Sequence, residues 1–149
     1  MVEIKKLLPI IVGGIGIAVL GYYLIKKIPA VAAPKKIAVV YSAGDRASAG
    51  IIRSARPQYA YVEISPDPAQ LPTILRQVAP YKRWVLLGGR FANPLTWVMI
   101  RAGIIREVGP NEALVQGGVY RGIPFHTAAG GTGPLTQQAA RELLARRII

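Results

Sequence analysis

Residues 83–96 read RWVLLGGRFANPLT and contain the pattern that decides the fold. The stretch begins with a continuous apolar run, passes through a glycine pair and reaches Pro94. An apolar run of this length without alternation is typical of a strand that is buried on both faces. Proline is favoured in the first turn of a helix, because the amide hydrogen that it lacks would have no partner there. The stretch therefore predicts a strand, a tight turn and a helix.

The same unit repeats along the rest of the chain. Strands are predicted at residues 37–42, 59–65 and 83–87, and helices at residues 47–55, 68–78 and 94–106. A strand at 113–116, a glycine-rich hairpin return at 119–127 and a closing amphipathic helix at 136–147 follow. Strands that alternate with helices pair in parallel through right-handed crossovers. The order therefore predicts an α/β domain with a small, mostly parallel sheet flanked by helices.

One helix start carries a further signal. Asp67 stands before Pro68 and fits an N-cap followed by proline. Pro72 follows closely, and it predicts that the first turn of this helix is a separate 3₁₀ piece. The apolar segment at 94–106 is interrupted by Arg101 and Gly103, so it is interpreted as a core helix and not as a membrane span.

The glycine pair of residues 83–96 has an echo near the end of the chain. Residues 88–96 read GGRFANPLT and residues 130–136 read GGTGPLT. Each unit predicts a helix N-terminus whose unpaired N–H groups can bind an anion. The loop at residues 42–45 is expected at the same edge, where open parallel sheets usually bind ligands. The candidate anion or ligand site consists of Gly88, Gly89, Asn93, Gly130, Gly131 and Thr132. The alternative is that both units are only tight turns, with Asn93 capping one helix and Thr132 or Gly133 starting the other.

These two units also carry a family resemblance. The strand-GG-x-x-x-NPLT unit at residues 85–96, and the GGTG segment that opens an Ala-rich helix at residues 130–140, resemble the α/β domain of archaeal S-layer and S-layer-like envelope proteins. The resemblance implies a structural role in a cell envelope, with the domain on the outer side of the membrane. This chain is smaller and more basic than those proteins, and it has an N-terminal anchor in place of a long ectodomain.

Residues 7–25 read LLPIIVGGIGIAVLGYYLI and contain no charge over 19 residues. As a helix this stretch would be about 28 Å long, close to the thickness of the hydrocarbon core of a bilayer. Lysines flank it on both sides, and Tyr22 and Tyr23 lie where an interfacial aromatic belt is expected. A cleaved signal peptide is the alternative, with the AVAA of residues 30–33 as its cleavage site. The sequence predicts a transmembrane anchor at residues 1–28, a linker at 29–36 and the α/β domain at 37–149.

Within the predicted anchor, Gly14, Ala18 and Gly21 fall on one helix face. Small side chains let a second helix approach closely, so this face predicts self-association or packing against a partner; ordinary membrane-helix composition is the alternative. Two lysines precede the span and four follow it. The positive-inside rule then places the domain on the interior side, whereas the family resemblance favours the exterior. The chain is predicted to be a single-pass membrane protein, and the two arguments place its C-terminal domain on opposite sides of the membrane.

The composition excludes several kinds of site. The 149 residues include no Cys and one His, which rules out disulfides, thiolate metal sites and a Cys nucleophile. No cofactor and no metal are expected. The chain has 19 Lys and Arg against 7 Asp and Glu, for a net charge of +12. Such a chain attracts nucleic acid, anionic lipid or another polyanion.

The acidic side chains of the domain have structural interpretations. Asp67 caps a helix, Glu63 points outward from a strand, and Glu107 and Glu142 are predicted on helix surfaces beside arginines. His126 is interpreted as a structural histidine in a strand. A hydrolase triad is formally available, although no serine occupies a nucleophile elbow; its members would be Ser42 or Ser48, His126 and Asp45.

The predicted function is therefore non-enzymatic. We expect a membrane-anchored structural or assembly protein of an archaeal-type cell envelope or of a membrane-containing virion. Its partners would be the lipid bilayer, further copies of the chain and other envelope or virion proteins. The alternative is a membrane-tethered basic module that binds nucleic acid or another polyanion, and the third candidate is a small membrane-tethered hydrolase.

Overall fold

The computed structural model describes residues 36–149. The anchor predicted at residues 7–25, with Gly14, Ala18 and Gly21, lies outside the described residues. Between residues 36 and 149, no helix combines the length and the apolar character needed to cross a bilayer.

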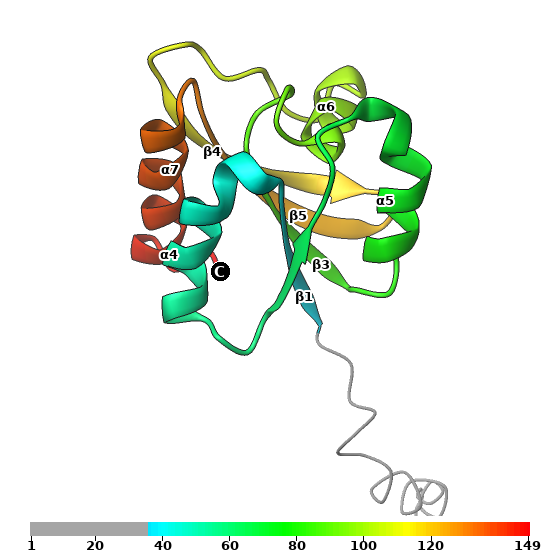
Figure 1. Cartoon of the computed structure of the whole chain (residues 1–149), viewed down its shortest axis with the longest axis horizontal. Coiled ribbons are helices and arrows are strands. Elements are labelled where there is room, and N and C mark those ends of the chain that lie inside the picture. Colours follow the sequence, from blue (N-terminus) through cyan, green and yellow to red (C-terminus); the bar gives the residue numbers. More distant parts are fainter. Residues whose placement is uncertain (1–35) are drawn as a thin grey trace, which may run out of the picture. The chain divides into compact units, whose positions relative to one another are not determined.

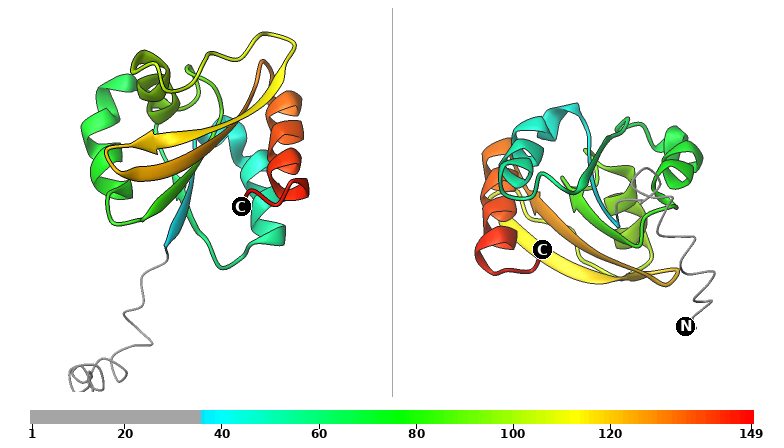
Figure 2. Two further views of the ribbon diagram at one scale, coloured as in Figure 1. Left: turned by 180° about the vertical axis from the view of Figure 1, so that it is seen from behind. Right: turned by 90° about the horizontal axis from the view of Figure 1, so that it is seen from below.

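A five-stranded sheet forms the centre of the described domain (Figure 1). Its strands are β1 (Ile37–Tyr41), β2 (Ala60–Glu63), β3 (Arg83–Leu87), β4 (Ala113–Tyr120) and β5 (Ile123–Gly130). They lie in the order β2-β1-β3-β5-β4, and every pair is parallel except β4 with β5. Seen from behind in Figure 2, β4 and β5 form a long hairpin along one edge. The prediction of an α/β domain with a mostly parallel sheet is confirmed.

Helices cover both faces of this sheet. The helical elements are η2 (Ala43–Asp45), α4 (Arg46–Ala55), η3 (Pro68–Gln70), α5 (Leu71–Val78), α6 (Pro94–Arg101) and α7 (Gly133–Ala145). Helices α4 and α7 pack on one face, where Ile52 and Leu143 are fully buried against Val39. Helices α5 and α6 pack on the other, and Trp84 and Phe125 fill the core there. Because both faces are covered, the inner strands are apolar without alternation.

The predicted break at Pro72 is present. Residues 68–70 form the 3₁₀ helix η3, and α5 begins at Leu71. The Asp67 side chain caps η3 by accepting a hydrogen bond of 2.9 Å from the Ala69 amide. Pro72 lies in the first turn of α5, because a proline has no amide hydrogen to donate and so does not continue the preceding 3₁₀ helix.

The hairpin prediction was wrong in its boundaries. The chain does not turn at Gly117 and Gly118, which lie inside β4 opposite His126 and Phe125. A Cβ atom at Gly117 would stand 2.8 Å from His126 Cδ2, so glycine is needed here to make room for a large side chain on the neighbouring strand. The reversal occurs at Arg121 and Gly122, which both have positive φ, as a two-residue type I′ hairpin requires.

Helix α6 ends five residues earlier than predicted, at Arg101. Gly103 follows with φ +76°, its amide donates to Ile100 O, and the Ile104 amide donates to Met99 O. This is the Schellman arrangement, in which a glycine of positive φ closes a helix. Glu107 consequently lies in the segment between α6 and β4, not on a helix as predicted, and it pairs there with Arg90 at 3.3 Å.

Candidate functional site

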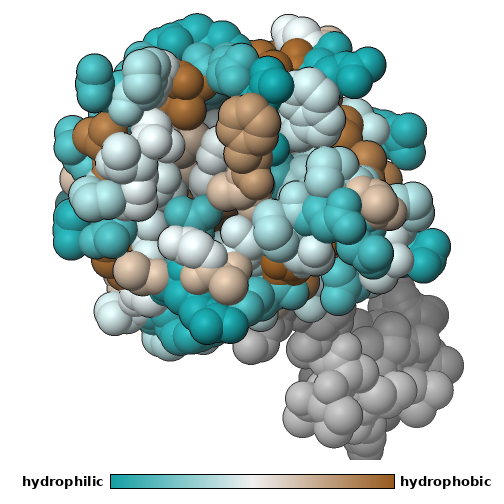
Figure 3. All heavy atoms as spheres, turned by 45° about the horizontal axis from the view of Figure 1, so that its top comes forward, coloured by the Kyte–Doolittle hydropathy of each residue, from teal (hydrophilic) through white to brown (hydrophobic). Residues whose placement is uncertain are grey.

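A cavity of about 460 Å³ lies at the edge of the sheet where the parallel strands end. Figure 3 turns this edge toward the viewer and shows pale, weakly polar residues surrounded by hydrophilic ones. Three chain segments that follow β1, β3 and β5 form most of its wall, and the segment before β4 completes it. The lining residues are Gly44, Asp45, Gly88, Gly89, Arg90, Phe91, Ala92, Glu107, Val108, Pro110, Gly130, Gly131, Thr132, Gly133 and Thr136.

The position of the cavity follows from the topology. The chain leaves the end of β1 toward α4 on one face of the sheet, and it leaves the end of the neighbouring β3 toward α6 on the opposite face. The connections from neighbouring strands therefore diverge between β1 and β3, and they leave a crevice above the ends of these strands. Ligands of open α/β sheets bind at this kind of point.

Five of the six residues predicted for the ligand site line this one cavity. Gly88 and Gly89 follow β3, while Gly130, Gly131 and Thr132 follow the neighbouring strand β5. The two glycine-pair turns thus lie side by side at one edge of the sheet. Whether this site binds a ligand stays a prediction.

Asn93 does not line the cavity. Its side chain is fully buried, and its amide nitrogen donates to Val40 O and Leu87 O, each at 3.1 Å. Its side-chain oxygen accepts from the Leu95 amide at 3.0 Å and so caps α6. Asn93 therefore joins the ends of β1 and β3 to the start of α6, and it has no group left for a ligand.

The first turn depends on the conformation of one glycine. Gly88 has φ +99°, whereas Gly89 lies outside the left-handed region. A side chain at Gly88 would also collide with the carboxylate of Asp45 and the methyl group of Ala92. Gly88 thus turns the chain and leaves space for Asp45.

The second turn depends on close approach and not on positive φ. A Cβ atom at Gly130 would overlap the backbone of Leu135 at the start of α7, and one at Gly131 would overlap the backbone of Pro110. Thr132 caps α7 by accepting from the Leu135 amide at 3.4 Å. The absence of side chains here lets helix α7 and the segment before β4 close around the end of β5.

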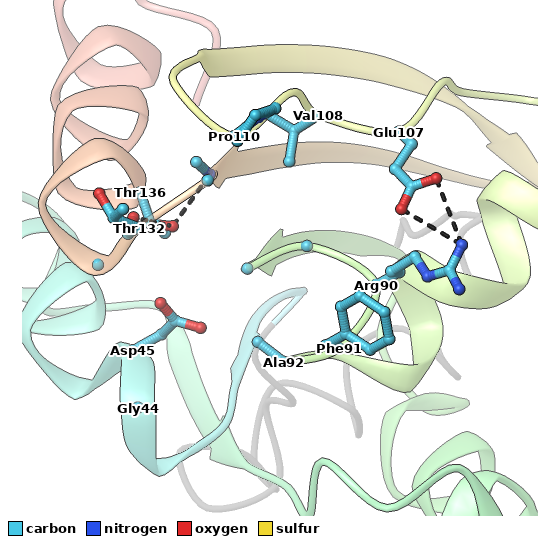
Figure 4. Close-up of a pocket in the computed structure, with 15 residues that line it drawn as sticks. Gly44, Asp45, Arg90, Phe91, Ala92, Glu107, Val108, Pro110, Thr132 and Thr136 are labelled. Carbon is cyan, nitrogen blue, oxygen red and sulfur yellow. Dashed lines mark hydrogen bonds and ion pairs between the residues drawn. The ribbon is translucent and has the colours of Figure 1, made fainter.

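Asp45 lines the cavity but is not among the six predicted site residues, although its loop at 42–45 is expected at this edge. It is only 6% exposed, and no donor among residues 36–149 forms a hydrogen bond with its carboxylate. Figure 4 shows the carboxylate directed into the cavity, between the two glycine turns. Burial raises the pKa of Asp45 above its ordinary value. The sequence does place Asp45 directly after the first predicted strand, where a ligand-binding residue can lie. An aspartate before a helix is also typical of an N-cap, and the sequence does not distinguish the two roles.

The opposite side of the cavity carries a paired charge and an exposed ring. The Arg90 guanidinium pairs with Glu107, and it lies 4.6 Å from the ring centroids of both Phe91 and Trp97. The Phe91 ring is 80% exposed. An apolar ring in water at the rim of a cavity is available for contact with a ligand or a partner.

The glutamates of the domain are all held by arginines. Glu63 pairs with Arg46 at 2.6 Å, and Glu142 pairs with Arg146 at 2.8 Å. Glu112 pairs with Arg106 and also accepts from the Gly109 amide, and these two hydrogen bonds lower the pKa of Glu112 to about 2. Among residues 36–149, no three Asp, Glu or His side chains gather as a metal site.

His126 lies away from the cavity, in the middle of β5. Its Nδ1 atom has no hydrogen-bond partner among the described residues. Burial lowers the pKa of His126, and the positive charge of Arg83 lowers it further. His126 is therefore separated from the other members of the triad considered above, because Ser42 and Asp45 follow the end of β1 and Ser48 lies in α4.

No family model matches the chain, and no curated protein matches it. A function is therefore inferred from the sequence of this chain and from the residues of its cavity.

Proposed function

We propose that the chain is a membrane-anchored, non-enzymatic assembly protein of an archaeal-type cell envelope or a membrane-containing virion, and that the cavity edge of its α/β domain is the binding face. The observation that supports the non-enzymatic part of this proposal is the distribution of acidic groups. Catalysis by a paired general acid and general base needs two titratable groups that converge on a substrate. In the described cavity, Glu107 is neutralised by Arg90, and Asp45 is the remaining carboxylate.

The architecture supports binding for a second reason. Glycines from three loops form much of the cavity wall, so the backbone is accessible there without covering side chains. Concave sites with a few polar groups and exposed backbone are typical of binding sites. The exposed Phe91 beside this cavity provides the kind of aromatic contact that protein interfaces favour.

The membrane part of the proposal rests on the sequence of residues 7–25. Alkaline carbonate extraction tests it, since an anchored chain stays in the membrane pellet whereas a peripheral one is released. We expect the full-length chain in the pellet. Recovery of a soluble product that begins near residue 33 or 34 would favour the cleaved signal peptide.

The location of the domain is tested by proteolysis of intact and opened cells or particles. Digestion of residues 37–149 in intact material supports an envelope role on the outside. Protection until the membrane is opened contradicts the exterior position and favours the alternative function.

That alternative, binding of a polyanion, is favoured by one face of the domain. Helices α4 and α7 lie side by side, and Arg53, Arg141 and Arg147 on or next to them are exposed. Polyanion binding falls steeply with salt, because each phosphate contact releases counterions. Replacing Arg53 and Arg141 by glutamine should weaken binding of single-stranded DNA, whereas Arg76→Gln on α5, on the opposite face, should have a smaller effect.

A further inference from the structure

The Asp45 carboxylate is uncompensated in the described domain. Of the six acidic residues between positions 36 and 149, four glutamates pair with arginines and Asp67 caps η3. Asp45 has neither a cation nor a hydrogen-bond donor among these residues, although it is nearly completely buried. Burial removes part of the hydration of this carboxylate, so a ligand that brings a positive donor to it gains a charge-assisted hydrogen bond at a low cost in desolvation.

The cavity is built to admit such a group. Gly44, Gly131 and Gly133 at its rim are exposed, and a Cβ atom at Gly44 or Gly133 would meet nothing within 4 Å. The carboxylate points into the cavity, where the end of a long, thin side chain can reach it. The exposed Phe91 ring at the rim already stacks with Arg90, and it offers apolar contact to the stem of an entering side chain.

An anion is the less suitable occupant. The start of α7 faces the cavity and favours negative charge. The positive side chain in the wall, Arg90, is already paired with Glu107. A bound anion would therefore lie beside the Asp45 carboxylate without a free arginine of the cavity to balance the two charges.

The chain itself has a surplus of the matching group. It carries 19 Lys and Arg against 7 Asp and Glu. Eight arginines of residues 36–149 form no ion pair with an Asp or Glu side chain of these residues: Arg53, Arg56, Arg76, Arg83, Arg101, Arg121, Arg141 and Arg147. Each copy thus has one open acceptor and several free cations.

We propose that the cavity receives a basic side chain from a second copy of this chain, whose ammonium or guanidinium group binds the Asp45 carboxylate. This proposal rests on the proposed function, because anchoring holds the copies in one membrane at high local concentration. The contact is heterologous, since a protruding side chain of one copy enters a recess of the next. Contacts of this type extend into rings or arrays unless they are blocked.

Site-specific photo-cross-linking tests the proposal in membranes. The chain has no cysteine, so Gly44→Cys can be labelled selectively with benzophenone maleimide at the cavity rim. Equal amounts of ¹⁵N-labelled and unlabelled full-length chain, reconstituted in one membrane, distinguish links between copies from links within one copy. Gly50→Cys is the matched control, since it is also a glycine with open space around its Cβ position but lies outside the cavity.

We expect links from position 44 to a Lys- or Arg-containing peptide of another copy. Asp45→Asn should reduce their yield about tenfold or more, because a buried charge pair loses one partner. Asp67→Asn changes the net charge equally on an exposed cap and should leave the yield unchanged. Added L-argininamide should compete for the cavity, whereas the same concentration of glucose should not.

Several results would overturn the proposal. One is the finding of links within one copy only, and another is an unchanged yield of links between copies in the Asp45→Asn variant. A third is competition by glucose in place of L-argininamide, which would identify a hydroxyl-bearing ligand. Absence of links from a chain that stays in the carbonate-washed pellet overturns this inference but leaves the membrane anchor standing. Loss of the chain from the pellet is instead a failure of the proposed function. The fluorescence of Trp84 and Trp97, both in the described domain, verifies that each variant is folded.

Discussion

The turn between β3 and α6 and the turn between β5 and α7 share the pattern of a glycine pair followed by Pro-Leu-Thr, yet their glycines are required for different reasons. After β3, Gly88 adopts a positive φ that other residues rarely adopt. After β5, Gly130 and Gly131 lie where the backbones of α7 and of Pro110 come too close for a side chain. Similar sequences therefore mark a conformational requirement in one turn and a packing requirement in the other.

The caps of the two turns differ as well. Asn93 is buried and makes three hydrogen bonds that connect two strands with a helix, whereas Thr132 is exposed and makes one long cap bond. The first turn is thus fixed by its polar side chain and the second by its backbone packing.

The largest effect is expected from Asn93→Ala. This change removes the cap of α6 and leaves Val40 O and Leu87 O without a donor, so we expect a loss of about 3 kcal/mol in the free energy of unfolding. Thr132→Ala, at the equivalent place after β5, should cost about 1 kcal/mol. Urea titration of the full-length chain in detergent measures both, because its two tryptophans report on the α/β domain alone. Equal losses would contradict the difference between the caps.

Gly88→Ala should have the next largest effect. The alanine must adopt φ near +99° and its methyl group meets the Asp45 carboxylate, so we expect a loss of about 2 kcal/mol. Gly89→Ala is the matched control. Its methyl group would meet only Val108 at an ordinary 3.5 Å, and the free energy of unfolding should change by less than about 0.5 kcal/mol. Similar costs at both positions would show that the turn does not depend on the φ of Gly88.

Gly130→Ala tests the second turn. The added methyl group overlaps the backbone at the start of α7, and the helix must shift outward, at a cost of about 1.5 kcal/mol. Gly133→Ala, in the first turn of α7, meets nothing within 4 Å and should leave stability unchanged or raise it by about 0.5 kcal/mol. The same urea titrations separate the two. A larger loss at Gly133 would contradict the packing explanation.

The same distinction explains what the sequence could predict. Local rules placed β1, β3, the Asp67 cap and the break at Pro72, because each depends on residues close together in the chain. They also brought the glycine pairs to one edge, since parallel strands end at a common edge. They failed at Gly117 and Gly118, which look like a turn but make room for His126 and Phe125 across the strand pair.

The cavity itself depended on contacts that no local pattern records. The sequence predicted Asn93 as a site residue, but its side chain forms hydrogen bonds to the backbone of two strands and is not available to a ligand. Asp45 occupies the N-cap position of α4, but no backbone amide of η2 or α4 donates a hydrogen bond to its side chain. The segment at 107–110 closes the cavity only because α6 ends early at Gly103. Each outcome depends on which polar groups find hydrogen-bond partners in the folded domain. The apolar runs that predict the strands do not say which residues will be neighbours in space.

Leaving the control variants aside, the smallest effect is expected from Asp45→Asn, and it is a gain in stability. Asp45 lies between the two turns, with the Arg90 and Glu107 pair across the cavity. Burial raises the pKa of Asp45 above the ordinary 3.8, so the folded domain holds this proton more tightly than the unfolded chain. Stability then falls as pH rises from the ordinary pKa to the raised one, and the full penalty of the ionised carboxylate remains above that window. Asparagine escapes this penalty, and we expect a gain of about 1 kcal/mol at neutral pH that disappears below the ordinary pKa.

Urea titrations of the Asp45→Asn variant and the wild-type chain across this pH range measure the difference. Glu112→Gln is the control of opposite sign, because the Arg106 and Gly109 hydrogen bonds lower the pKa of Glu112 to about 2. That variant should be less stable than wild type at neutral pH, and the deficit should shrink as pH falls through the acidic range toward 2. If Asp45→Asn is destabilising at neutral pH, the ionised carboxylate has a stabilising partner, and the cavity between the two turns is not an open acceptor. A gain that grows with pH and then levels off is the behaviour of a buried acid whose ionised form has no stabilising partner in the folded domain.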